Sequence, residues 1–329
     1  MGIADRVRKV REGLASAAVN GQAMRLDVAT GEQLWRRGVP KGPSPLAHHA
    51  DTAWVAGGDG LLGFDAAAGT QTAEVELPGR ATALAAGAVG MWAVVDGERV
   101  VGVEPGAARI VAETATGHAA RIAVGMDAVW VSCPARYAGT SAVVALDPAG
   151  GERWRAGVGG LPAGLTHADG IVWVARAASA TGHVGGAVLA LDAATGEVVA
   201  ELPALAAVSE VAVADRAVFV AARGGDAATV VKLDACGGGR LAEVDVPDRP
   251  AVLAADRGTV WVASWRADLR RRKGTAAIRR LDARSGRVVD TWEVRHTPID
   301  VAASPDGLWI TTFDTIDSAT DVAAWTGLS

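Results

Sequence analysis

The sequence predicts an all-β protein, a seven-bladed β-propeller of four-stranded antiparallel blades, from three observations. A short apolar run centred on an aromatic residue occurs seven times, at Trp54, Trp92, Trp130, Trp173, Phe219, Trp261 and Trp309. An apolar residue followed by an acid also occurs seven times, ending at Asp27, Asp65, Glu104, Asp147, Asp192, Asp234 and Asp282. Both series recur every 38 to 48 residues, a period that indicates a repeat architecture. Four-stranded units repeated around an axis make a propeller.

Each unit supplies four strands, which we name A to D from the axis outward. Strand A has a large apolar residue eight positions before the aromatic, and mostly alanine at the next position. Strand B carries the aromatic, strand C ends at the acid, and strand D follows a tight turn. Glycine with φ > 0 is expected in that turn, at Gly31, Gly69, Gly151, Gly196, Gly238 and Gly286. The copy at Glu104 has Gly106 instead and is irregular.

The two ends of the chain are expected to share one blade. Residues 22–37 have the pattern of strands C and D, whereas residues 298–313 have the pattern of strands A and B. Pairing them closes the ring and removes an exposed sheet edge. Apolar residues at helical spacing predict an amphipathic helix or lid segment in residues 1–20, ahead of a propeller over residues 21–329.

Variation in length is confined to one kind of loop. The spacing from acid to next aromatic is 26 or 27 residues, but that from aromatic to next acid ranges from 11 to 21. All insertions therefore lie between strands B and C, at the end of the disc that also carries the D–A loops. Because function tends to reside in varied loops on a rigid scaffold, this end is the predicted functional face.

Composition narrows the class of protein. A net charge of −5 and a pI near 5.7 argue against a nucleic-acid partner. No apolar run is long enough to span a membrane, and residues 1–20 lack the pattern of a secretory signal. We therefore expect a cytoplasmic protein without a membrane partner. Cys133 and Cys236 fall at opposite ends of the disc and are not expected to pair.

The repeats resemble a broad superfamily of bacterial propellers. Leu26–Trp35 and Leu191–Glu197 look like quinoprotein-type repeats, while Thr297–Trp309 looks like the YVTN and virginiamycin B lyase type. The resemblance covers nearly the whole chain and implies the fold more strongly than an activity. In the lyase group a histidine on this kind of face acts as a base with a magnesium ion, but no histidine here matches that residue by motif. Quinone-binding members typically have eight blades, a secretory signal and often adjacent cysteines, so a quinone cofactor is not implied.

Charged residues gather at the predicted mouth, the end of the ring axis on the functional face. Nine positions before the aromatics, a row of small or apolar residues is interrupted by Arg121, Glu210 and Asp300. The D–A loops add Arg80, His118, Arg249 and His296. Such a ring could bind a polar ligand and transfer protons, or its charges could merely solvate the opening.

The B–C insertions supply candidate walls for the same site. They contribute Arg136, Tyr137, Arg176, His183, Arg223, Trp265 and Arg266. The run Arg270–Lys273 could hold an anion, although such runs are more often solvated. Trp265 could stack on an aromatic ligand or simply anchor its loop.

Two functions follow as hypotheses. The first is a lyase, isomerase or cyclase without an organic cofactor, with magnesium as an optional metal and a small-molecule substrate. Glu210 or Asp300 would act as the base, His118 or His296 as the acid, and Arg121 as an anion clamp. The alternative is a non-catalytic scaffold that binds a protein or peptide on the same face, using exposed aromatic anchors for which Trp265, Phe313 and Trp325 are candidates.

Overall fold

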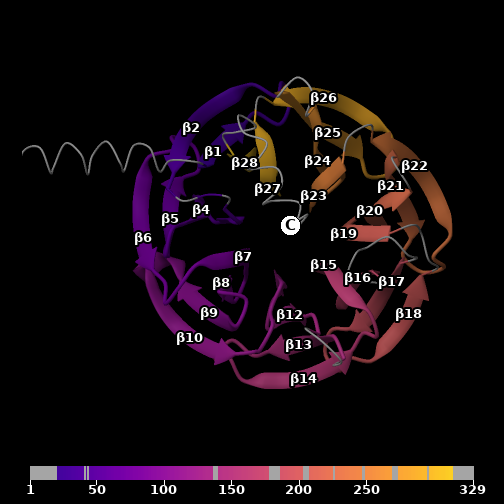
Figure 1. Ribbon diagram of the computed structural model, residues 1–329, viewed down its shortest axis with the longest axis horizontal. Helices are drawn as coiled ribbons and strands as arrows, with labels where there is room; N and C mark the ends of the chain where they lie inside the picture. Colours follow the sequence, from indigo (N-terminus) through magenta and orange to yellow (C-terminus); the bar gives the residue numbers. More distant parts are fainter. Residues whose placement is uncertain are drawn as a thin grey trace, which may run out of the picture.

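The computed structural model confirms a seven-bladed propeller (Figure 1). It describes residues 21–40, 42, 44–135, 140–177, 186–202, 207–224, 227–246, 249–268, 273–294 and 296–313. These form seven separate four-stranded antiparallel sheets arranged around an axis. The predicted helix in residues 1–20 lies outside the described residues, as do residues 314–329.

The first four blades follow the chain in the expected A to D order. Their strands are β3 (Leu46–His49), β4 (Thr52–Gly57), β5 (Gly60–Asp65) and β6 (Gln71–Glu76); β7 (Ala81–Gly87), β8 (Gly90–Val95), β9 (Arg99–Glu104) and β10 (Arg109–Ala115); β11 (Arg121–Val124), β12 (Val129–Cys133), β13 (Ala142–Leu146) and β14 (Glu152–Gly157); β15 (Leu161–Ala168), β16 (Ile171–Ala177), β17 (Gly186–Asp192) and β18 (Val198–Leu202).

Blades 5 and 6 continue this order, and blade 7 joins the two ends of the chain. Their strands are β19 (Ala207–Ala214), β20 (Ala217–Gly224), β21 (Ala227–Asp234) and β22 (Arg240–Val246); β23 (Arg249–Asp256), β24 (Thr259–Asp268), β25 (Lys273–Asp282) and β26 (Val288–Val294); β27 (Thr297–Ser304), β28 (Gly307–Phe313), β1 (Gly21–Leu26) and β2 (Gln33–Val39). Blade 7 has the order β2-β1-β28-β27, so β1 pairs with β28 as the sequence predicts.

The core consists of seven apolar layers, each between two neighbouring blades. The strand B aromatics are almost fully buried there, with Trp54, Trp92, Trp130 and Trp309 each about 1% exposed. Strands B and C are buried on both faces, which explains their continuous Val, Ala, Leu and Ile composition. Burial of this area is the main stabilising contribution to the ring.

The C–D turns behave as predicted, with two differences. At Asp27 the carboxylate Oδ1 accepts bonds from the amides of Ala29 and Thr30, at 2.9 and 2.8 Å, and Gly31 has φ +73°. In blade 3 the residue with positive φ is Gly150, not the expected Gly151. In blade 2 a 3₁₀ turn over Pro105–Ala107 places Ala108 at φ +48°, so alanine occupies the position that glycine has elsewhere.

Tryptophans of strand D clasp the next blade at three junctions. Trp35 donates from Nε1 to the carbonyl of Ala66 at 3.0 Å, and Trp154 does the same to Ala193 at 3.1 Å. Each indole covers the turn glycine of the next blade, so that a Cβ on Gly69 or Gly196 would lie 2.6 Å from the ring. Trp292 covers Gly31 of blade 7 in the same way.

Two histidines of strand A stack on the buried tryptophan of the preceding blade. The His48 and Trp309 rings are 4.0 Å apart and nearly parallel, and the His167 and Trp130 rings are 4.3 Å apart. Each stacked pair joins two neighbouring blades, so both histidines have a structural role.

Candidate functional site

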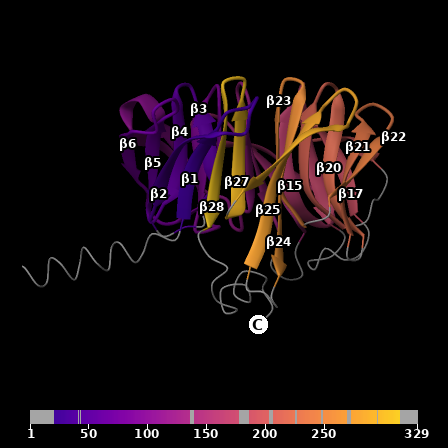
Figure 2. The ribbon, with the colours of Figure 1, turned by 90° about the horizontal axis from the view of Figure 1, so that it is seen from above.

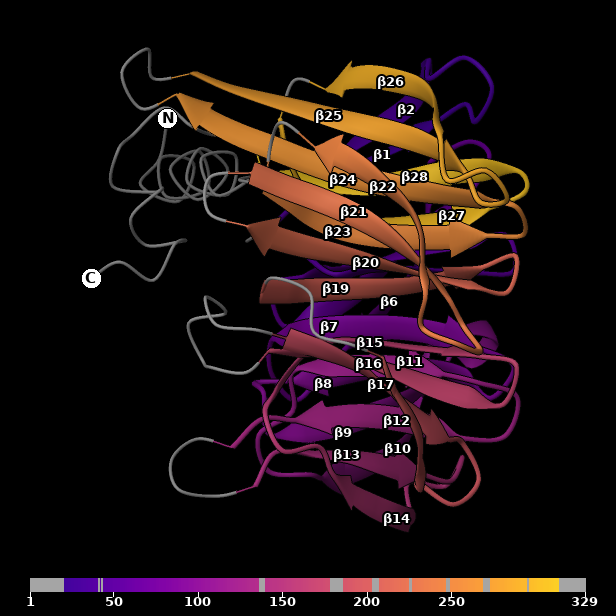
Figure 3. The same cartoon turned by 90° about the vertical axis from the view of Figure 1, so that its right-hand side faces the viewer.

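We define the B–C face as the end of the disc that carries the B–C and D–A loops, and the A–B face as the opposite end. Figures 2 and 3 show the B–C face with the ends of β24 and β25 extending beyond the neighbouring strands. The innermost strands surround the axis (Figure 1). Two features of this face are a charged row around the axis and the extended hairpin of blade 6.

Arg121 and Glu210 lie together although they come from blades 3 and 5. The Arg121 Nη2 is 3.4 Å from Glu210 Oε2, and its Nε donates to the carbonyl of Ala163 at 2.9 Å. The arginine therefore crosses the inner strand of blade 4 on its way to the carboxylate. Its side chain is 46% exposed, whereas that of Glu210 is 14% exposed.

Gly164, in blade 4, allows the inner strands β15 and β19 to lie close together. A Cβ at Gly164 would lie 2.8 Å from Glu210 Cα and 3.0 Å from the amide nitrogen of Val211. Contacts this close to backbone atoms do not occur for real side chains, so β15 and β19 can approach this closely only with glycine here. Gly164 belongs to the same row as Arg121 and Glu210, in the blade between them.

Asp300 is held by backbone amides. Its Oδ2 accepts a bond from the amide of Leu46, in blade 1, at 2.9 Å, and its Oδ1 accepts one from its own neighbour Val301 at 2.9 Å. The carboxylate thus links blade 7 to blade 1 across the seam where the ring closes. The sequence did not predict that Asp300 would join two neighbouring blades by a hydrogen bond.

Burial raises the pKa of both carboxylates, Glu210 and Asp300. It raises the pKa of Glu210 to about 7, an effect that Arg121 opposes and Asp300 reinforces. Burial also raises the pKa of Asp300 to about 6, against the two amides and Arg121. Both groups therefore titrate closer to neutral pH than ordinary carboxyls do.

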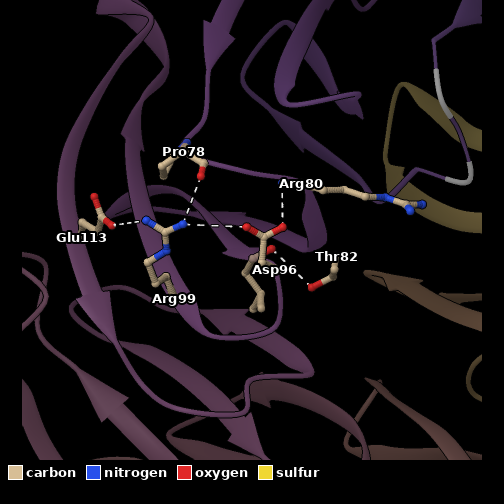
Figure 4. A network of polar contacts seen from close by, with 7 residues as sticks. Pro78, Arg80, Thr82, Asp96, Arg99 and Glu113 are labelled. Carbon is tan, nitrogen blue, oxygen red and sulfur yellow. Dashed lines mark hydrogen bonds and ion pairs between the residues drawn. The ribbon is translucent and has the colours of Figure 1, made fainter.

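The predicted site residues in the D–A loops and nearby are engaged in different ways. The Arg80 amide donates to Asp96 Oδ1 at 3.0 Å, while its side chain extends away from the network that joins Asp96, Arg99 and Glu113 (Figure 4). His118 and His296 are both half-buried. Arg176 is paired with Glu201 at 2.6 Å across blade 4, which gives it a structural partner.

The expectation for Trp265 as a stacking surface needs correction. Trp265 lies within β24, where it pairs with Arg249 of β23, and is only 7% exposed. Strand B of blade 6 continues through this residue because β24 is ten residues long. The indole therefore anchors the hairpin, the other of the two roles considered for it. Phe313, a second candidate anchor, is partly buried at the end of β28.

Several predicted site residues cannot be placed as side chains. Arg136, Tyr137, His183 and the candidate anchor Trp325 lie outside the described residues. Arg223, Arg249 and Arg266 are placed only as backbone, in β20, β23 and β24 respectively.

Blade 6 extends beyond its own sheet. The pairing of β24 with β25 continues to Asp268 opposite Lys273, but β23 pairs with β24 only up to Trp265. On the other side, β26 pairs with β25 only up to Ala276. We call residues 266–268 and 273–275 the blade 6 arm. The signal for it was the longest aromatic-to-acid spacing, 21 residues from Trp261 to Asp282, but spacing alone did not show that the extra residues continue the strands.

No helix in the described part of the chain is long and apolar enough to cross a membrane. No three His, Cys, Asp or Glu residues within it are grouped so that they could hold a metal ion.

Comparison with known proteins supports the repeat family. The family model described as outer membrane protein assembly factor BamB matches residues 139–305, more than half of the chain. None of the curated proteins matches the chain.

Solved structures share the fold at low identity. BamB from Moraxella catarrhalis is 14% identical with a TM-score of 0.56, covering 86% of this chain and 89% of that one. A chain of the mitotic checkpoint complex is 12% identical with a TM-score of 0.63, covering 82% and 89%. Hydrazine synthase from Kuenenia stuttgartiensis is 15% identical with a TM-score of 0.61, covering 81% and 90%. At these identities the likeness shows the fold alone.

Proposed function

The chain belongs to the family of outer membrane protein assembly factor BamB, and from this premise we propose that it is a non-catalytic scaffold that binds a protein or peptide on its B–C face. The family is described by its part in assembling other proteins, which favours docking over turnover. The small-molecule lyase that the sequence also suggested has no comparable support from the comparisons.

The blade 6 arm is the observation that carries this proposal. Its residues lie beyond the strands that complete the blade, since neither β23 nor β26 reaches them. Within the described part of the chain they pair with each other and not with β23 or β26. An extension of this kind on the face with the varied loops is suited to contact another molecule.

The charged row supports the same function. Arg121 and Asp300 bond to neighbouring blades, and Arg176 is paired with Glu201. These contacts join strands within and between blades, which gives the described part of the B–C face a fixed base for docking.

Site-specific photo-cross-linking in the source host tests the proposal. A photoreactive residue at Thr275, in the arm, is expected to trap one protein partner reproducibly. The matched control carries the residue at Met126, which is 78% exposed in an A–B turn on the opposite face. Cross-linking of the same protein from Met126 but not from Thr275 contradicts the proposal, as does the absence of any adduct at Thr275.

Acid–base chemistry on a small molecule is a second candidate, favoured by one observation. The pKa values of Glu210 and Asp300, about 7 and about 6, suit proton transfer near neutral pH. Native mass spectrometry of protein purified from its host would support this function if it showed a retained small molecule that Glu210→Gln and Asp300→Asn both release. Retention of the same molecule by both variants would count against it.

A further inference from the structure

Two acids at the mouth follow backbone bulges in the inner strands of blades 5 and 7. The register shifts between Val208 and Glu210 in β19, and between Pro298 and Asp300 in β27. A bulge inserts one extra residue and redirects the side chains beside it. Both strands lie beside the axis (Figure 1), so the two carboxylates come from different sides of one opening.

The two carboxylates share Arg121 as their cation. The Arg121 Nη2 is 3.4 Å from Glu210 Oε2, whereas a charge-assisted hydrogen bond is normally about 2.7 to 2.9 Å long. Within the described residues the Glu210 carboxylate makes no other hydrogen bond or ion pair. The charge of Arg121 also lowers the pKa of Asp300, whose oxygens are bonded only to backbone amides. One half-exposed guanidinium therefore serves two acids, and it contacts only one of them.

Charge balance favours a cation as the ligand of this cluster. When both acids are ionised, the three side chains have one negative charge in excess. Burial and the nearby Asp300 raise the pKa of Glu210 to about 7, which shows that the doubly ionised state is costly here. One added cation would balance the cluster, whereas an added anion would increase the excess.

The surroundings favour a cation on an alkyl stem. In the same row of the inner strands, the blades without a charge have Pro45, Ala83 and Val252, with Gly164 in blade 4. Pro45 and Val252 are partly exposed, so they offer apolar surface beside the acids. A lysine side chain combines an apolar stem with a compact ammonium group that has three donors.

Resting on the scaffold function proposed above, we propose that the protein partner places a lysine side chain in the mouth, where its ammonium group binds Glu210 and lies beside Asp300. Its stem lies against the apolar residues of the row. Arg121, whose Nε is bonded to the carbonyl of Ala163, competes with the ammonium group for Glu210.

Three peptide probes test the sign of the charge. The first is Gly-Gly-Lys-Gly-Gly with blocked ends and a neutral fluorophore, and its binding to the whole protein is measured by anisotropy at pH 8 and low salt. The second has norleucine in place of lysine, which keeps the stem without the charge, and the third has glutamate. We expect the lysine probe to bind about tenfold more tightly than either of the others.

The affinity of the lysine probe should also depend on pH. Glu210 and Asp300 take up protons as the pH falls through about 7 and about 6, while lysine stays charged. Binding is therefore expected to weaken by about tenfold or more between pH 8 and pH 5. The norleucine probe should show no such change.

Two variants separate the roles of the acid and the arginine. Glu210→Gln should reduce binding of the lysine probe to the level of the norleucine probe. Arg121→Gln should strengthen it, by about threefold or more, because a competing cation is removed. The matched control is Asp169→Asn, which removes one charge from an A–B turn on the opposite face, at a φ of +51° that asparagine tolerates. It should leave binding unchanged.

Thermal unfolding checks that each variant is folded. If Glu210→Gln does not fold, the comparison of lysine with norleucine on the parent protein still decides. Equal binding of these two probes overturns the lysine site, as does undiminished binding by folded Glu210→Gln. Tighter binding of the glutamate probe, lost in Arg121→Gln, would show an anion site instead.

Failure of the lysine site is distinct from failure of the scaffold function. If the lysine probe does not bind but a partner is still trapped from Thr275, the site is wrong and the scaffold stands. If the lysine probe binds and no partner is trapped, the partner is wrong as the source of the ammonium group. Butylamine that displaces the probe would then indicate a free amine as the ligand.

Discussion

At the mouth of the ring, Glu210 is a buried acid whose ionisation affects the stability of the protein. It is an acid whose pKa in the folded protein is about 7, above the ordinary value of 4.5, because burial disfavours its charged form. The folded state therefore binds more protons than the unfolded state between these two pH values. By linkage, Glu210 makes the protein less stable as the pH rises from about 4.5 to about 7.

Replacing this acid by an amide should remove that cost. We expect Glu210→Gln to be more stable than the parent at pH 8, by roughly 1 to 3 kcal/mol, and little different at pH 4.5. Urea unfolding at the two pH values measures both differences. A variant less stable than the parent at pH 8 would show that the pairing with Arg121 outweighs the cost of burial.

The stacked histidines should have the opposite effect on stability. Burial lowers the pKa of His48 and His167 below the ordinary 6.5, so the unfolded chain takes up protons first as the pH falls. Their contribution is present above pH 6.5 and is lost as the pH falls from there through the folded pKa. His167→Phe keeps a ring over Trp130 without a titrating group. We expect its unfolding free energy to fall less than that of the parent between pH 7.5 and 5, and an equal fall would refute this role.

At the scale of the element, turn glycines and strand D tryptophans fit together across blade junctions. Gly196 has φ +77°, and a Cβ there would lie 2.6 Å from the indole of Trp154. Gly239, in the corresponding region of blade 5, has no atom within 4 Å of an added Cβ. The pair offers a comparison of the same substitution in two environments.

Alanine should therefore destabilise one blade and not the other. Gly196→Ala is expected to cost about 2 kcal/mol or more, since it adds backbone strain to a clash with a ring. Gly239→Ala should change stability by less than about 0.5 kcal/mol. Thermal or urea unfolding measures the stability of both variants. Equal losses would mean that the contact between Trp154 and Gly196 does not stabilise the junction between blades 3 and 4.

The elements differ in how well the sequence predicts them. Strand identity, order and the composite blade 7 follow from periodic apolar residues, which depend on local pattern and burial. Five of the inner strands, β7, β15, β19, β23 and β27, contain a register shift that the pattern did not show. A bulge adds one residue without changing composition, so spacing cannot reveal it.

The candidate site was only partly predictable for a related reason. Alignment of the repeats placed Arg121, Glu210 and Asp300 in one row. It could not show that Arg121 bonds to the carbonyl of Ala163 and reaches Glu210, or that Asp300 binds the amide of Leu46, because these contacts depend on how adjacent blades pack. For Trp265 the sequence left open a stacking surface or a loop anchor, and only the extension of β24 in the folded protein favours the anchor.

At the scale of the whole molecule, the ring presents two faces with different construction. The A–B face has short turns of nearly constant length, whereas the B–C face carries every insertion and the blade 6 arm (Figures 2 and 3). The N- and C-terminal strands close the ring in blade 7 through the full pairing of β1 with β28. A rigid closed disc with one elaborated face is consistent with docking another protein.

Hydrogen–deuterium exchange of the purified protein, with and without the partner trapped from Thr275, tests the central claim most directly. Binding on the B–C face predicts slower exchange in residues 266–268 and 273–275 and in the D–A loops, with no change in the A–B turn at residues 125–128. Protection confined to the A–B turns, with unchanged exchange in the arm, would contradict the account.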